Sequence, residues 1–306
     1  MTSGQTTPGP HPEVHPRARV ALETTLLAHG VPKGEGLPLA ARLASIVRVQ
    51  GALPQVVGMV DGQPIVGMTD AQLTAMLAAP SSEVRKVNTA NLGTIMHRRG
   101  FGATTVSTTM ELAAGAGVSV FATGGIGGVH PMDAAALRLD ISADLLAFTR
   151  FPVAVVTSGV KSILDVASTR EMLETLGVPV IGWKCDAFPA FYLREAQGGV
   201  GRVDARFDDM RDLATFVRHE LSRTRRGIVI CNPIPAAHEL PRSDWFRWLS
   251  EAERRAAQAG ACGRDATPAL LAALHEVSGG ATLRANIALV ESNAHVAAML
   301  ARAMVD

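Results

Sequence analysis

Four short apolar runs rich in β-branched residues alternate with stretches of helical periodicity along this chain. The runs cover residues 118–121, 153–156, 178–181 and 228–230. Strands that are buried on both faces have such continuous apolar sequences, and parallel pairing needs a crossover between them, usually a helix. The pattern therefore predicts an α/β fold, a single three-layer α/β/α domain with a mostly parallel central sheet.

The remaining segments fit the same plan. Residues 19–22 predict a first strand, and residues 56–60 and 64–66 predict a hairpin around the turn Asp61-Gly62. Residues 281–304 have helical periodicity. Because no internal repeat or long linker interrupts the pattern, we expect a single domain, a catalytic one, over residues 17–306. Residues 1–16, rich in Pro, Gly, Thr and His, predict a disordered tail.

Composition excludes several classes of protein. With 29 basic and 28 acidic side chains and 4% aromatic residues, the chain has neither the positive field nor the stacking surface of a nucleic-acid binder. No apolar stretch is long enough to span a membrane, and the N-terminus does not resemble a signal peptide. The three cysteines are far apart and lack CxxC spacing, which favours reduced thiols and a cytoplasmic protein.

Lys161 is the first candidate for chemistry. Residues 151–165 predict a buried strand, a turn of small residues and then a helix, with Lys161 at the start of that helix. Burial and the positive end of a helix dipole both disfavour an ammonium group. An uncharged lysine attacks carbonyl carbon and forms a Schiff base. The alternative is a structural lysine that extends to solvent or pairs with Asp165.

Polar segments follow the predicted strands. Ligands bind beyond the carboxyl ends of parallel strands, so we expect Lys161 to share one rim of the sheet with Glu23, His130 and Asn232. A carboxyl group at a buried strand end has a raised pKa and can act as a general acid or base. Glu23 is therefore the candidate proton donor, and the alternative for it is a solvated strand end.

The glycine run at residues 124–128 does not fit a dinucleotide-binding motif, because His130 stands where the third glycine of GxGxxG is required. A loop whose N–H groups hold a phosphate or oxyanion remains open. Nearby, Asp140 and Asp144 are four residues apart and would share one face of a helix. Such a pair could hold a hard divalent ion, and the alternative is helix capping by Asp140 and Ser142.

Together these segments resemble the pseudouridine-5′-phosphate glycosidase family, also called the indigoidine synthase A-like family. The resemblance extends from about residue 18 to 300 in the order of the family's motifs. It is carried by residues 21–25 with His29-Gly30, then 102–106, 121–130, 140–145, 161–165, 232–235, 278–280 and 285–287.

The resemblance implies chemistry at C1 of ribose 5-phosphate, in a homotrimeric enzyme. Lys161 matches the lysine that forms a Schiff base with the ring-opened sugar, and Glu23 matches the residue that donates or accepts the proton. Asp140 matches a ligand of Mn²⁺, with water molecules completing the shell. The implied substrate-binding residues are Lys86, Val106, His130, Ser142, Ala143, Asp144 and Asn286, the last of them near the nucleobase.

The chain departs from the family in loops around these residues. After Lys86-Val87 the family usually has Ser-Arg-Arg-Asp-Leu-Pro, where this chain has Asn-Thr-Ala-Asn-Leu-Gly. Pro131 stands in place of an arginine, and residues 31–36 lack the usual proline–asparagine pattern. Loss of polar groups beside an unchanged sugar site is how an enzyme would accept another aglycone.

We therefore hypothesise a C-glycosynthase that joins C1 of ribose 5-phosphate to an aromatic polyketide-type aglycone in antibiotic biosynthesis. The alternative is a glycosidase that reversibly cleaves pseudouridine 5′-phosphate to uracil and ribose 5-phosphate. A third hypothesis is a sugar-phosphate binding protein without activity. The presence of Glu23, Asp140 and Lys161 argues against the third.

Overall fold

The computed structural model describes residues 13–131, 140–196, 199, 201–258 and 266–306. Most of the tail expected over residues 1–16 lies outside this part. Within it, the backbone N–H of His15 donates to the carbonyl oxygen of Gly51 at 2.9 Å, so the end of the expected tail contacts the fold. No helix of the described residues is long and apolar enough to cross a membrane.

Ten strands of the described chain form one sheet in the order β4-β5-β2-β1-β6-β7-β10-β8-β9, with β3 also paired to β2. Parallel pairing joins seven of these strands, in the order β2, β1, β6, β7, β10, β8 and β9. Strands β3 and β5 run antiparallel to β2. The strands are β1 (Arg19–Glu23), β2 (Leu53–Val60), β3 (Gln63–Val66), β4 (Val84–Val87), β5 (Phe101–Thr104), β6 (Val120–Ala122), β7 (Ala154–Thr157), β8 (Val180–Trp183), β9 (Ala205–Phe207) and β10 (Ile228–Cys231).

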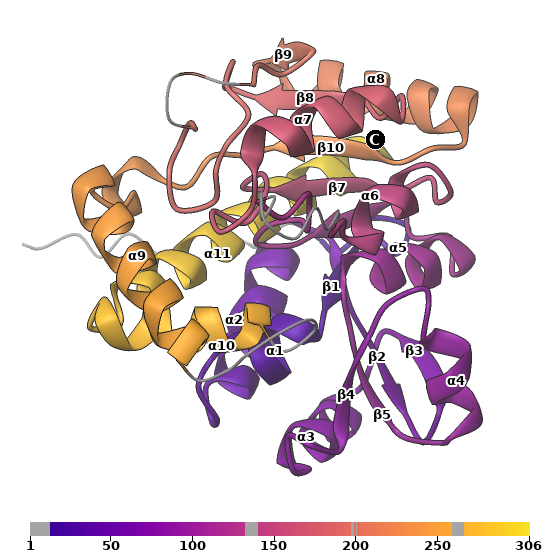
Figure 1. The fold of residues 1–306 in the computed structure, drawn as a ribbon. Coiled ribbons are helices and arrows are strands. Elements are labelled where there is room, and N and C mark those ends of the chain that lie inside the picture. The colour runs from indigo at the N-terminus through magenta and orange to yellow at the C-terminus, as the bar shows by residue number, and fades with distance from the viewer. Residues whose placement is uncertain (1–12, 132–139, 197–198, 200, 259–265) are drawn as a thin grey trace, which may run out of the picture.

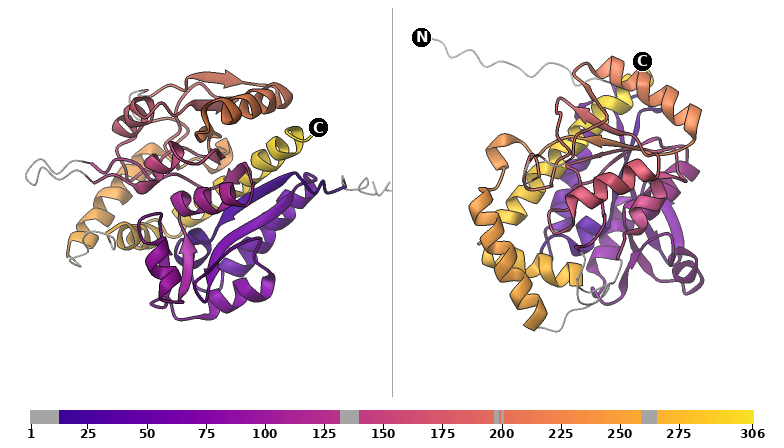
Figure 2. Two further views of the ribbon diagram at one scale, coloured as in Figure 1. Left: turned by 90° about the vertical axis from the view of Figure 1, so that its right-hand side faces the viewer. Right: turned by 45° about the horizontal axis from the view of Figure 1, so that its top comes forward.

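Helices cover both faces of this sheet. Helices α2, α8 and α11 pack together on one face, and α5 and α6 pack on the other (Figure 1). Figure 2 shows α11, in yellow, between the purple N-terminal elements and the salmon end of the sheet. The helices are α1 (Thr25–His29), α2 (Gly36–Val49), α3 (Asp70–Ala78), α4 (Leu92–His97), α5 (Val106–Gly115), α6 (Ala143–Phe148), α7 (Val166–Thr175), α8 (Met210–Thr224), α9 (Arg242–Gln258), α10 (Ala266–Val277) and α11 (Ala281–Ala303), with a 3₁₀ turn at Ala236–His238.

The α/β fold with a mostly parallel sheet is confirmed. The central strands are apolar throughout because both of their faces are covered; all four residues of β7 and of β10 are buried. The hairpin is also confirmed, with Asp61 and Gly62 at φ values of 49° and 71°, as a two-residue turn of this kind requires. Beyond this hairpin, β4 and β5 extend the sheet on its antiparallel side, and the sequence pattern did not predict them.

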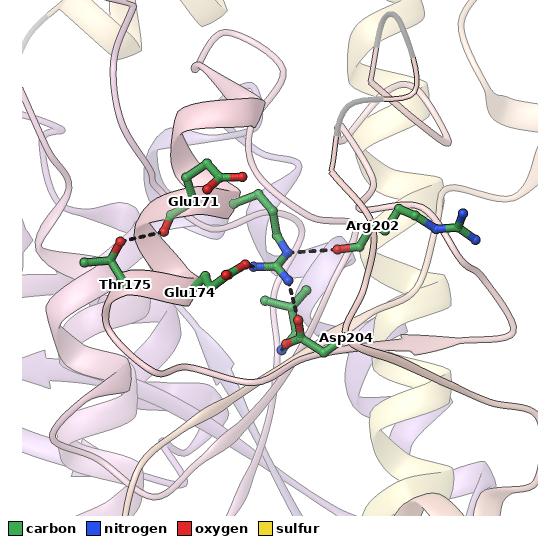
Figure 3. A network of polar contacts seen from close by, with 7 residues as sticks. Glu171, Glu174, Thr175, Arg202 and Asp204 are labelled. Atoms are coloured by element: carbon green, nitrogen blue, oxygen red, sulfur yellow. Dashed lines mark hydrogen bonds and ion pairs between the residues drawn. The ribbon is translucent and has the colours of Figure 1, made fainter.

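A buried arginine of α7 connects this helix to β8 and to the segment before β9, at one edge of the sheet (Figure 3). Arg170 donates through Nε to the carbonyl oxygen of Arg202 at 2.8 Å and pairs with Glu174 and Asp204. The other oxygen of Asp204 accepts from the N–H of Val180 at 2.8 Å. These contacts fix β8 and the segment before β9, well away from the candidate site.

Candidate active site

An open cleft of about 1770 Å³ lies where strands β1, β6 and β7 end. It is a larger space than most small-ligand pockets occupy. Its wall includes both candidate catalytic residues and all seven residues expected to bind substrate, together with Asp140. These residues are Glu23, Lys86, Val106, His130, Asp140, Ser142, Ala143, Asp144, Lys161 and Asn286.

Glu23 is the last residue of β1 and lies deep in the cleft. Its Oε1 accepts a hydrogen bond from the hydroxyl of Thr123, which follows the neighbouring strand β6. Burial raises the pKa of Glu23, while the positive charge of Lys161 and the Thr123 hydrogen bond lower that pKa by smaller amounts. The prediction of a carboxyl group with a raised pKa is therefore confirmed, and its cause is desolvation.

Lys161 follows β7 but does not begin a helix, so that part of the sequence prediction is wrong. Chain pairing continues past the strand, because Val160 forms a parallel bridge with Ile126 and the N–H of Lys161 donates to the Ile126 carbonyl at 3.1 Å. Helix α7 starts only at Val166, and Asp165 caps it by accepting from the N–H of Ser168 at 2.9 Å. Lys161 therefore lies in a loop, half-buried, five residues before the start of α7.

Lys86 reaches the same cleft from β4, within the antiparallel extension of the sheet. Burial and the charge of Lys161 lower the pKa of Lys86, so the two side chains act on each other electrostatically. The carbonyl of Lys86 accepts from Nδ2 of Asn91 at 3.1 Å. Two lysine side chains, one on β4 and one after β7, line one cleft, and such a pair suits an anionic ligand.

The two aspartates do not form the expected pair on one helix face. Asp140 lies before α6, and Ser142 is the N-cap residue, whose Oγ accepts from the N–H of Asp144 at 3.2 Å. Asp144 is buried and uses both carboxylate oxygens, accepting from the N–H groups of Ser107 and Gly127 at 2.9 Å each. Ser142 therefore caps α6 as the alternative predicted, and Asp140 does not.

The donors near Asp140 do not form a protein-built metal site. Its carboxylate is 65% exposed, and the nearest ionisable partner is His130, with Nε2 at 3.9 Å. Over the described part of the chain, no three His, Cys, Asp or Glu side chains come together in a way that could hold a metal ion. Residues 132–139, between these two, lie outside that part. One exposed carboxylate fits only a largely hydrated ion such as Mn²⁺ with most of its water shell.

The glycine run is required for close packing. Two of its N–H groups are used within the protein: Ile126 donates to the Gly159 carbonyl at 3.0 Å, and Gly127 donates to Asp144. A Cβ on Gly127 would collide with Ser142, and one on Gly128 would collide with Thr169. The loop therefore packs tightly at Gly127 and Gly128, and a role in holding a phosphate or oxyanion stays a prediction.

Asn286, on α11, presents an amide to the cleft. It is 8% exposed, and its Oδ1 is buried without any hydrogen-bond partner in the described structure. A Cβ on Gly124 would lie 3.3 Å from this oxygen and 3.3 Å from Cε2 of Phe191, so the amide and the aromatic ring are close neighbours. A buried amide oxygen without a partner is costly unless a ligand supplies one.

Three residues lie behind the cleft. Asn232 follows β10 at the expected edge of the sheet but does not line the cleft, because its Nδ2 donates to Asn293 Oδ1 at 2.9 Å inside the protein. Thr123 contacts Glu23, and Asn293 contacts Thr123. Neither residue had a sequence signal of its own, because Asn293 lies within a helix and Thr123 lies in a glycine-rich turn.

The chain matches the family model described as indigoidine synthase A like protein over residues 14–303. That match covers nearly the whole sequence, including every candidate site residue. The chain belongs to the indigoidine synthase A-like family.

Relatives in this family include the pseudouridine-5′-phosphate glycosidase of Symbiobacterium thermophilum, which is 43% identical over 293 residues, 94% of this chain and 93% of that protein. The enzyme of the same name from Geobacillus kaustophilus is 42% identical over 284 residues, 92% of each chain.

Two solved structures of the family share the fold. The prealnumycin C-glycosynthase AlnA in complex with ribulose 5-phosphate has a TM-score of 0.81 at 34% identity, covering 93% of this chain and 91% of that one. An indigoidine synthase A-like protein of Thermotoga maritima has a TM-score of 0.82 at 32% identity, covering 97% and 98%. The family thus contains both of the activities that the sequence left open.

Proposed function

We propose that this enzyme of C-glycoside chemistry cleaves pseudouridine 5′-phosphate reversibly to uracil and ribose 5-phosphate. One structural observation carries the proposal: Asn286, whose buried amide oxygen has no hydrogen-bond partner in the described structure, lines the same cleft as Lys161, Glu23 and Lys86. Relatives above 40% identity along almost the whole chain are named for this reaction. The comparisons therefore favour the activity that the sequence analysis placed second.

Lys161 is the proposed nucleophile. Its amine forms a bond to C1 of the ribose while the bond from C1 to the ring oxygen breaks. The released oxygen takes a proton, and Glu23 is the proposed donor because its raised pKa lets it keep that proton at higher pH than an ordinary glutamate. The sugar is then open and attached to the enzyme.

The C–C bond breaks in the second stage. The lysine nitrogen, positively charged after bonding to C1, first returns a proton to the Glu23 carboxylate and so regains an electron pair. That pair forms the C=N bond of an iminium as the electrons of the C–C bond move to C5 of uracil, which takes the proton from Glu23. Water then adds to the iminium and returns the amine of Lys161 and the aldehyde of ribose 5-phosphate. The reverse sequence forms the same bond, so a single site supports both directions.

The other groups of the cleft have separate proposed roles. Lys86 holds the 5′-phosphate, since its ammonium faces the cleft from the edge strand β4. Asn286 recognises uracil: its amide oxygen accepts from a ring N–H of uracil, and its amide nitrogen donates to the adjacent uracil carbonyl. Val106, Ser142, Ala143, Asp144 and His130 complete the proposed substrate contacts.

A C-glycosynthase that uses an aromatic polyketide-type aglycone in antibiotic biosynthesis is the second candidate. It is favoured by the likeness to AlnA and by the size of the cleft, about 1770 Å³. Against it stands Asn286, because a ring without an N–H donor would leave the buried amide oxygen unsatisfied.

Two further properties stay within the proposal. Asp140 would be the single protein ligand of a hydrated Mn²⁺, which a Mn²⁺ titration of chelator-treated wild type and Asp140→Asn checks; the steps above do not pass through a metal. We propose a cytoplasmic homotrimer. Size-exclusion chromatography coupled to light scattering should then give a mass three times that of one chain.

The two activities are separated by incubating the purified protein with each substrate set. The proposal expects release of uracil from pseudouridine 5′-phosphate, and formation of that compound from uracil and ribose 5-phosphate. Coupling of ribose 5-phosphate to an aromatic polyketide phenol, without measurable uracil release, would replace it by the synthase.

A further inference from the structure

Asn293 is buried completely behind the cleft and contacts the segments that follow three neighbouring strands. Its Nδ2 donates to the carbonyl of Thr123, after β6, at 2.8 Å, and to the hydroxyl of Ser158, after β7, at 3.1 Å. Its Oδ1 accepts from Nδ2 of Asn232, after β10, at 2.9 Å. One side chain thus uses both its donor and its acceptor to join the carboxyl ends of β6, β7 and β10.

These contacts lead to both candidate catalytic residues. Thr123, whose carbonyl is held by Asn293, directs its hydroxyl to Glu23. Ser158 stands three residues before Lys161, and its N–H donates to the Gly124 carbonyl at 2.9 Å. The segment that supports Glu23 and the segment that carries Lys161 therefore meet at one buried amide.

The same helix also carries Asn286, two turns before Asn293. Residues seven apart lie on one face of a helix. The face of α11 that turns toward the strand ends therefore presents one amide to the cleft and buries a second one under it. Nothing in the proposed chemistry uses Asn293 directly, since its side chain is fully enclosed.

We propose that Asn293 is a positioning residue that sets Glu23, through Thr123, against the loop that carries Lys161. The inference rests on the proposed function, because it gives these two residues their roles. An aspartate in this place has the same shape but no N–H to donate, so it would face the Thr123 carbonyl and Ser158 without satisfying them. The main chain at Thr123 would then shift, and small displacements of reacting groups cost large factors in rate.

The test compares Asn293→Asp with Leu300→Ala, a core truncation seven residues further along α11, where Leu300 is fully buried. We expect Asn293→Asp to lower kcat about 100-fold while KM stays within about threefold, because ground-state binding is untouched. The rate of borohydride trapping with ribose 5-phosphate should fall alongside, and the acidic limb of the kcat profile should move. Leu300→Ala, measured at a temperature where the two variants are equally folded, should keep kcat near the wild-type value.

An Asn293→Asp variant that keeps kcat, or loses no more than Leu300→Ala at equal stability, would make Asn293 a packing residue only. If Asn293→Asp does not fold, Asn293→Ser is measured in the same way, because its smaller side chain leaves space for a bridging water. Failure of the proposed function itself is distinguishable: the wild type would then neither release uracil nor form an adduct with ribose 5-phosphate.

Discussion

Thr123 donates its hydroxyl hydrogen to Oε1 of Glu23 where β6 and β1 end side by side. The contact holds the carboxyl group in one orientation inside the cleft. Burial raises the pKa of Glu23, and this contact and the charge of Lys161 offset only part of that rise. Glu23 therefore keeps its proton to a higher pH than an ordinary glutamate and can donate it inside the cleft.

Replacing Glu23 with glutamine removes the proton but keeps the shape and an acceptor for Thr123. We expect kcat for pseudouridine 5′-phosphate to fall about 10²–10⁴-fold, the usual contribution of general acid–base catalysis. Steady-state kinetics measure the loss. An unchanged kcat would show that another group supplies the proton.

The same substitution has a pH-dependent effect on stability. Because the pKa of Glu23 is raised in the folded state, the wild type gains stability at low pH and loses it as pH rises through the raised pKa. Glu23→Gln should therefore have the higher Tm above that pKa, with the difference shrinking toward acid pH. Thermal unfolding across the pH range checks this, and a difference that grows toward acid pH would contradict it.

Asn286→Leu tests the amide that the cleft leaves unpartnered. Losing two hydrogen bonds to uracil should raise KM for pseudouridine 5′-phosphate about 10–100-fold. Trapping with ribose 5-phosphate alone should be unchanged, because that reaction has no nucleobase. Equal losses in both assays would mean that Asn286 supports the fold rather than the aglycone.

Lys86→Met tests the proposed phosphate contact. Ribose 5-phosphate should bind about 10–100-fold more weakly, the usual loss for a hydrogen bond to a charged group. Ribose without phosphate serves as the control, since wild type and variant should handle it alike. A similar loss with both sugars would place Lys86 elsewhere in the reaction.

Asp144→Asn addresses stability at the substrate side of the cleft. Asp144 accepts from two backbone N–H groups, and an asparagine has only one oxygen, so one buried donor loses its partner. We expect the free energy of unfolding to fall by about 1–3 kcal/mol. Ser142→Ala, which removes only the helix cap, should cost about 1 kcal/mol. Urea unfolding compares them, and equal stability of Asp144→Asn and wild type would contradict the assigned contacts.

Local pattern and strand order account for what the sequence predicted well. Buried parallel strands have an apolar signature, and their carboxyl ends meet at one edge, so the sequence pattern predicts Glu23 and Lys161 on a common rim. The error at Lys161 has a tertiary cause. Pairing of Val160 with Ile126 prolongs the extended chain, and this long-range contact delays α7 to Val166.

The remaining features depend on tertiary contacts that no local pattern encodes. Lys86 lies in an exposed charged segment, and only the antiparallel extension carries it to the cleft. Asn293 has the sequence context of an ordinary helix residue, and its role appears only when three strand ends surround it. The family resemblance supplied Lys86, whereas nothing in the sequence distinguished Asn293.

The proposed mechanism depends on a Schiff base at Lys161. Wild type and Lys161→Ala are incubated with ribose 5-phosphate, reduced with borohydride, digested and analysed by mass spectrometry. We expect one sugar-phosphate adduct on the peptide that contains Lys161 and none in the variant. An adduct on Lys86, or an equal yield of adduct in Lys161→Ala, would contradict it.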